Sequence, residues 1–180
     1  MVSTVTAKKG IGVGLGLNYI PIARLEYKLN PEANFEIVDN IFWKPRLFYE
    51  FGNGFSAGII SEIYRKSIKP SGSTRYDLSC WSLGAYGDYG YEITESGRTL
   101  LVGGMEIKYG QFSGKVYFGS KSAGAVGITA LAGIRHYFSE PLSMEFDYRI
   151  GWQEFDIVNR SEKKYVFNGS SLQLYFGYGF

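Results

Sequence analysis

The sequence contains a single cysteine, Cys80, and a single histidine, His136. One cysteine excludes an internal disulfide framework and every metal site that needs several cysteine ligands. One histidine leaves little material for a zinc site or for histidine-based catalysis. We therefore expect neither a metal ion nor another cofactor in this protein.

Long apolar runs and an excess of charge are also missing. No apolar stretch reaches the roughly 18 residues that a transmembrane helix needs. The 19 basic and 17 acidic residues give a net charge of +2, without the basic bias expected of a nucleic-acid-binding protein. The polar segment 1–9 has no apolar core followed by a cleavage site. We therefore expect no nucleic-acid partner, and we expect an exported chain in its mature form with 1–9 as a flexible tail.

Glycine is abundant, with 24 residues, and 17 % of the chain is aromatic. Apolar residues alternate with polar residues or glycine over several segments, which is typical of β-strands and not of helices. In the segment 142–153 one parity holds Leu142, Met144, Phe146, Tyr148, Ile150 and Trp152, and the other holds Ser143, Glu145, Asp147, Arg149, Gly151 and Gln153. The segments 10–19 and 172–180 show the same pattern.

This pattern predicts eight strands, at about 10–20, 41–51, 55–66, 76–92, 99–110, 124–138, 142–156 and 166–180. Tight connections at 52–54, 95–98 and 139–141 contain glycine, asparagine, serine or proline, as hairpin turns require. They alternate with longer connections at 21–40, 67–75, 111–123 and 157–165. We predict one all-β domain, an up-and-down antiparallel transmembrane β-barrel with its short turns and termini facing the periplasm and long extracellular loops. Alternation continues through 20–40, so the first two strands could project beyond the bilayer as a long hairpin. Two extra short strands, which would make a ten-stranded barrel, are the alternative to eight.

Three observations favour an apolar outside over a soluble, lipocalin-like barrel with an apolar inside. The apolar parity is rich in large side chains, which would overfill the interior of an eight-stranded barrel. A soluble barrel has no structural reason to place glycine at four alternate positions, within 10–16, on the side of a strand that faces water. Aromatic residues also gather near strand ends, where the interfacial girdles of membrane barrels lie.

The C-terminal sequence LYFGYGF, residues 174–180, resembles the C-terminal signal of Gram-negative outer-membrane barrels. Together with the strand pattern, the chain resembles the small eight-stranded barrels of the OmpA/OmpX type. The resemblance implies an outer-membrane location, insertion by the outer-membrane assembly machinery and contact with outer-membrane lipid and lipopolysaccharide. It implies no uniform activity, and we expect a monomer. The residues assigned to the insertion signal are Tyr175, Phe176, Tyr178 and Phe180.

Ionisable residues occupy the inward parity of the predicted barrel. A buried charge is tolerated only when it is paired, so the near balance of the two signs predicts a salt-bridge network that plugs the lumen. A gate or a proton path is the alternative function of the same residues. The basic members are Lys44, Arg46, Lys108, Arg135 and Arg149, and the acidic members are Glu50, Glu62, Asp88, Glu106, Glu145 and Asp147.

The other residues with reactive or charged side chains give weaker evidence for a functional site. His136 has only Ser139 and Glu140 close by in sequence, and no His-x-Ser motif of the lipid A-modifying barrels is present. We interpret Cys80 as an apolar filler of the interior. The predicted long loops carry basic residues that suit lipopolysaccharide phosphates, namely Arg65, Lys66, Lys69, Arg75, Lys121, Arg160, Lys163 and Lys164, with Glu162 among them.

These features favour a non-enzymatic outer-membrane barrel with a charge-plugged lumen and a structural, adhesive or surface-contact role. Two alternatives remain. One is a small channel or hydrophobic-ligand conduit similar to the OmpW-type barrels, and the other is an enzyme that modifies lipid A.

Overall fold

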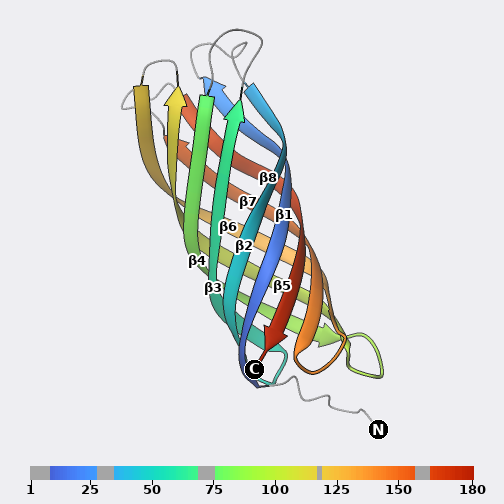
Figure 1. Cartoon of the computed structure of the whole chain (residues 1–180). Coiled ribbons are helices and arrows are strands. Elements are labelled where there is room, and N and C mark those ends of the chain that lie inside the picture. The colour runs from blue at the N-terminus through green and yellow to red at the C-terminus, as the bar shows by residue number, and fades with distance from the viewer. Residues whose placement is uncertain (1–8, 28–34, 69–75, 117–118, 157–162) are drawn as a thin grey trace.

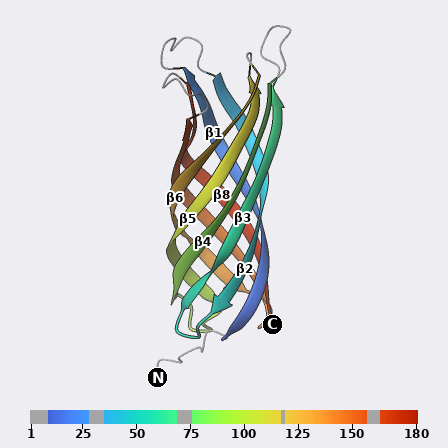
Figure 2. The same ribbon diagram turned by 90° about the vertical axis from the view of Figure 1, so that its left-hand side faces the viewer.

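The computed structural model describes residues 9–27, 35–68, 76–116, 119–156 and 163–180. Every strand in this part of the chain pairs antiparallel with the next, and β1 also pairs with β8, so that the sheet closes into a barrel (Figures 1 and 2). The predicted eight-stranded up-and-down barrel is confirmed. The strands are β1 (Gly10–Tyr27), β2 (Phe35–Glu50), β3 (Phe55–Ile68), β4 (Tyr76–Glu92), β5 (Thr99–Val116), β6 (Gly119–Tyr137), β7 (Leu142–Asp156) and β8 (Lys163–Gly179).

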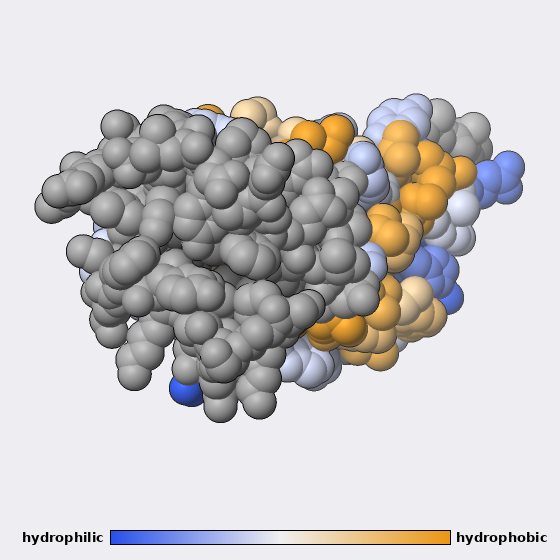
Figure 3. All heavy atoms as spheres, turned by 90° about the horizontal axis from the view of Figure 1, so that it is seen from above, coloured by the Kyte–Doolittle hydropathy of each residue, from blue (hydrophilic) through white to orange (hydrophobic). Residues whose placement is uncertain are grey.

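The barrel wall separates side chains by parity. On β7, the inward Asp147 and Arg149 are 0 % and 2 % exposed, whereas the outward Ile150 and Trp152 are 59 % and 53 % exposed. Hydrophobic side chains gather on the outer wall of the barrel (Figure 3). Such a wall is stable in lipid and not in water, so the soluble, lipocalin-like alternative is wrong. Within the described ranges there is no helix long and apolar enough to cross a membrane.

The three tight connections lie at one end of the barrel, together with the start of β1 and the end of β8 (Figure 1). We call it the turn end and the opposite one the far end. Gly52, Gly54 and Gly97 have φ values of 80°, 85° and 63°, which other residues adopt only with strain. The backbone N–H of Phe55 donates to Asn53 Oδ1 at 3.1 Å and fixes the first turn. The prediction that these turns share one end with both ends of the sheet is confirmed.

Several strands extend farther toward the far end than the predicted ranges, and β1 and β2 form the long hairpin expected around 20–40. Leu25 on β1 pairs with Phe35 on β2, and Val116 on β5 pairs with Gly119 on β6. The prediction of a long connection at 111–123 is therefore wrong, and the segment around 20–40 extends β1 and β2 instead of forming two further strands. On β5 and β6 the apolar alternation ends before the backbone pairing does, so the pattern underestimates the length of these two strands.

This correction also moves the basic residues assigned to the loops. Arg65 and Lys66 lie on β3, Lys121 on β6, and Lys163 and Lys164 on β8. The remaining members of that set, which are Lys69, Arg75, Arg160 and Glu162, lie outside the described residues, as does the predicted tail up to residue 8.

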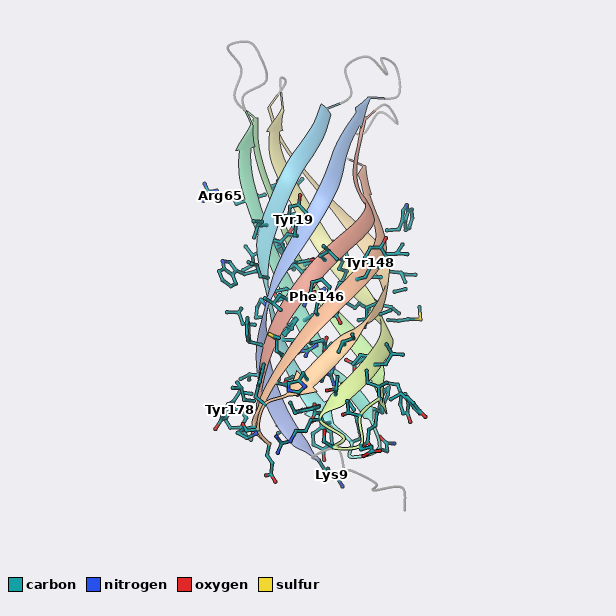
Figure 4. The ribbon with its side chains drawn as sticks, turned by 90° about the vertical axis from the view of Figure 1, so that its right-hand side faces the viewer. Lys9, Tyr19, Arg65, Phe146, Tyr148 and Tyr178 are labelled. Atoms are coloured by element: carbon teal, nitrogen blue, oxygen red, sulfur yellow. The ribbon has the colours of Figure 1, made fainter. Side chains whose placement is uncertain are left out.

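Phe146 allows a direct test of which side chains of β7 face the lipid. Phe146 lies near the middle of the apolar wall (Figure 4) and is 51 % exposed. Phe146→Arg should lower the free energy of unfolding by about 2–4 kcal/mol, and Phe138→Arg at the turn end by only about 0–1 kcal/mol, because the cost of a lipid-facing arginine depends on its depth. Urea titration of the barrel refolded in phospholipid vesicles measures both losses. Equal losses would contradict this placement.

Candidate functional site

The inward parity brings eleven ionisable side chains into the barrel lumen. All eleven are those that the sequence analysis assigned there, and even the most exposed, Glu50 and Lys108, have side chains only 13 % and 12 % exposed. They come from six strands, β2 to β7. Every one of them forms an ion pair with another member of the set.

Five of these side chains form a cluster nearer the turn end, which we call the lower cluster. Arg46 on β2 bonds Glu145 on β7 through both guanidinium Nη atoms, at 3.0 and 3.1 Å. Arg135 on β6 contacts the same carboxylate at 2.5 Å and Asp88 on β4 at 3.0 Å. Its second Nη lies 3.7 Å from Glu50. Two guanidinium groups therefore share one carboxylate in the middle of the lumen.

Neutral hydroxyl groups add hydrogen bonds to two carboxylates of the lower cluster. Ser56 donates its hydroxyl to Asp88 Oδ1 at 2.5 Å, and Tyr137 donates its phenol to Glu50 Oε1 at 2.6 Å. Buried carboxylates need such additional donors if the cost of removing them from water is to be offset. Ser56 and Tyr137 were not among the predicted site residues, although their inward parity is readable from the sequence.

The other six side chains form the upper cluster. Lys44 on β2 lies 2.6 Å from Glu106 on β5 and 2.8 Å from Glu62 on β3. Lys108 contacts Glu62 at 2.7 Å, and Ser82 donates to the same carboxylate at 3.0 Å. Arg149 on β7 bonds Glu106 across the lumen. The members are Lys44, Glu62, Glu106, Lys108, Asp147 and Arg149, of which Asp147 pairs with Arg149 at 2.9 Å.

Aromatic rings surround the guanidinium group of Arg46. The ring of Tyr175 lies 3.8 Å from it, and those of Phe48 and Tyr86 lie at 5.2 and 5.5 Å. Tyr175 also donates its phenol to the backbone oxygen of Lys44 at 2.5 Å. Cation–π contacts of this kind stabilise a desolvated arginine, so the aromatic rings hold Arg46 in place for Glu145.

Tyr175 fits because the neighbouring strand β1, which pairs with β8, has glycine at this level. A Cβ at Gly14 or Gly16 would lie within 2.6 and 2.5 Å of its ring atoms. The structure therefore places Tyr175, which the sequence analysis assigned to the insertion signal, inside the barrel. The other three signal residues, Phe176, Tyr178 and Phe180, are exposed on the outside at the turn end.

Other candidate groups are isolated. Thr99 Oγ1 lies 2.9 Å from His136 Nδ1, but no carboxylate among the described residues pairs with this histidine. The described residues contain no group of three or more histidine, cysteine or acidic side chains that could hold a metal ion. Cys80 is buried and lines a cavity of about 20 Å³ with Phe42 and Tyr64, which is room for about one water molecule. The two charge clusters are therefore the main arrangement of ionisable side chains in the described interior.

No protein-family model matches this chain, and no curated protein sequence matches it. Its fold is similar to that of Neisserial surface protein A, with a TM-score of 0.67, 16 % sequence identity and coverage of 95 % of this chain and 97 % of that one. For Ail, the attachment invasion locus protein of Yersinia pestis, the TM-score is 0.60 and the sequence identity is 16 %, with coverage of 96 % of this chain and 100 % of that one. For the outer membrane protein OprG from Pseudomonas aeruginosa, the TM-score is 0.60 and the sequence identity is 12 %, with coverage of 96 % of this chain and 97 % of that one.

The chain therefore has the fold of the small eight-stranded outer-membrane barrels, and the resemblance noted in the sequence is confirmed at the level of architecture. A closed barrel satisfies every backbone hydrogen bond within lipid, and its apolar outside and charged inside are the arrangement of outer-membrane proteins. The described barrel spans the outer membrane.

The upper cluster predicts an asymmetry between single and double variants. Arg149→Met leaves Asp147 without its described cationic partner, so it should lower the free energy of unfolding by about 3–5 kcal/mol. Arg149→Met/Asp147→Asn removes both charges of that pair and should be less destabilising than the single variant. Urea titration measures the difference. Arg98→Met, at an exposed arginine in the 95–98 turn, is the control, and a double variant that loses more than the single one would contradict the pairing.

Proposed function

We propose that this outer-membrane barrel is a non-conducting, non-enzymatic scaffold whose lumen is closed by the two charge clusters. The observation that carries the proposal is that the ion pairs join strands that are not neighbours. Arg46 and Glu145 link β2 to β7, and Lys44 and Glu106 link β2 to β5. These pairs cross the lumen instead of following the wall.

An ion that passed through the barrel would have to separate these pairs. Breaking a buried pair leaves uncompensated charges in a medium of low dielectric constant, which costs several kcal/mol per charge. Both clusters would have to open in succession, because they lie at different levels of the same lumen. This barrier supports a closed barrel over a small channel or a hydrophobic-ligand conduit.

The far ends of the strands support a role in surface contact. They continue beyond the apolar wall as paired strands, with Leu25 opposite Phe35 and Val116 opposite Gly119. Short turns face the periplasm in outer-membrane barrels, so we place the far end at the cell surface. One similar structure, Ail, is described as an attachment invasion locus protein, and attachment through the far end is the corresponding role that we propose here.

The proposal includes the partners of the barrel. Outer-membrane lipid covers its apolar wall, and this wall needs no second copy of the chain, so we propose a monomer. Insertion by the outer-membrane assembly machinery would use the exposed aromatic residues of the last strand, Phe176, Tyr178 and Phe180.

Conductance in planar lipid bilayers tests the closed lumen. The wild-type barrel should show no steady current, because the two clusters neutralise and fill the passage. Lys44→Ala/Arg149→Ala removes two cations from the upper cluster and leaves its carboxylates in excess, so a cation-selective leak should appear. Arg98→Ala, outside the lumen, should remain silent. A steady, ion-selective current through the wild-type barrel would overturn the proposal and favour the channel.

A further inference from the structure

A row of polar side chains crosses four neighbouring strands on the outside of the barrel, just beyond the apolar wall on the side of the far end. Arg65 on β3 is the register partner of Ser79 on β4, Ser79 that of Ser113 on β5, and Ser113 that of Ser122 on β6. Arg65, Ser113 and Ser122 are exposed, and Ser79 is half-buried. Figure 4 shows Arg65 pointing away from the barrel. We call these four residues the polar row.

Aromatic side chains lie directly below the polar row. The next outward row toward the turn end consists of Trp43, Ile63, Trp81, Gln111 and Gly124. The rings of Trp81 and Tyr109 are in edge contact, with centroids 6.4 Å apart. Tryptophan and tyrosine concentrate where lipid tails meet head groups, so the polar row lies at the level of the head groups.

Gly124 allows the phenol of Tyr109 to lie against the wall toward this level. A Cβ at Gly124 would lie 2.1 Å from the Tyr109 hydroxyl, so any larger residue would displace it. The Ser79 hydroxyl donates to the backbone oxygen of Ser113 at 3.4 Å, which leaves its lone pairs free to accept a hydrogen bond. The surface therefore combines one guanidinium group with several hydroxyl groups, and neither of the two rows contains a carboxylate.

We propose that the polar row binds the phosphorylated saccharide head group of lipopolysaccharide in the outer leaflet. Arg65 would contact a phosphate, and the hydroxyls of Ser79, Ser113, Ser122 and Tyr109 would contact sugar hydroxyls. Adjacent strands lie about 4.8 Å apart, so the row spans about 14 Å. A phospholipid with one phosphodiester would use Arg65 alone, whereas a phosphorylated disaccharide can occupy the whole row. This inference rests on the proposed function only in placing the far end at the cell surface.

Native mass spectrometry of the refolded full-length chain in detergent tests this site. The probes are deep-rough lipopolysaccharide, its dephosphorylated form and phosphatidylglycerol. Arg65→Gln should weaken lipopolysaccharide binding about tenfold, because a charge-assisted hydrogen bond to phosphate is lost, and should leave the dephosphorylated form unaffected. Ser113→Ala/Ser122→Ala should weaken binding of both saccharide lipids and leave phosphatidylglycerol unchanged.

Arg98→Gln is the matched control, because this exposed arginine lies in a tight connection at the turn end, outside both rows. Its lipopolysaccharide affinity should equal that of the wild type. The inference is overturned if Arg65→Gln has no effect, if Arg98→Gln has the same effect, or if Ser113→Ala/Ser122→Ala leaves lipopolysaccharide binding unchanged. The row lies outside the lumen, so these variants should keep the conductance of the wild type. If Arg65→Gln binds lipopolysaccharide as the wild type does while the wild-type barrel carries no current, this inference fails and the closed barrel stands.

Discussion

Mutual neutralisation of charges inside a narrow, closed wall is the constraint on which this structure depends. Eight strands leave an interior that side chains alone must fill. Here the filling includes six carboxylates and five cationic groups among the described residues, taken from β2 to β7. Each pair needs its partners at the correct height on distant strands. A strand that slipped by one residue would turn its charges toward lipid and leave their partners unpaired. The network therefore specifies the register of the barrel as well as closing its lumen.

The described lumen holds one more carboxylate than cations, and the carboxylate with the weakest ion pair, Glu50, is also the most exposed to water. Glu50 is near the turn end, is the most exposed of the lumen carboxylates and is 3.7 Å from Arg135, its described cation. Tyr137 supplies a hydrogen bond there instead. Deeper in the lumen, Glu145 is shared by two arginines and Glu106 by Lys44 and Arg149. Glu145 and Glu106 are each 1 % exposed, and the two cations on each carboxylate offset the cost of burying it.

The sequence alone revealed which side chains point inward, because the parity of a strand has no exceptions until its pairing is interrupted. It did not reveal which charges pair. Arg46 and Glu145 are separated by 99 positions, and their contact depends on barrel geometry that no local pattern encodes. Tyr175 lies on the inward parity that the sequence predicted, but its packing against the glycines of β1 and its contact with Arg46 depend on how the strands close into a barrel. The lengths of β5 and β6 were underestimated because the apolar alternation marks only the part of a strand that faces lipid.

The central claim, that the lumen charges are paired and shielded from water, is tested most directly by NMR of the arginine side chains in the refolded, ¹⁵N-labelled barrel. Exchange of the guanidinium Nε–H protons with solvent would be followed for Arg46, Arg135 and Arg149, with the exposed Arg65 and Arg98 as internal references. The account predicts that the three lumen arginines exchange far more slowly than the two references, at the rate at which the barrel itself opens. Exchange of the lumen arginines as fast as that of Arg65 and Arg98 would show a water-filled lumen and contradict it.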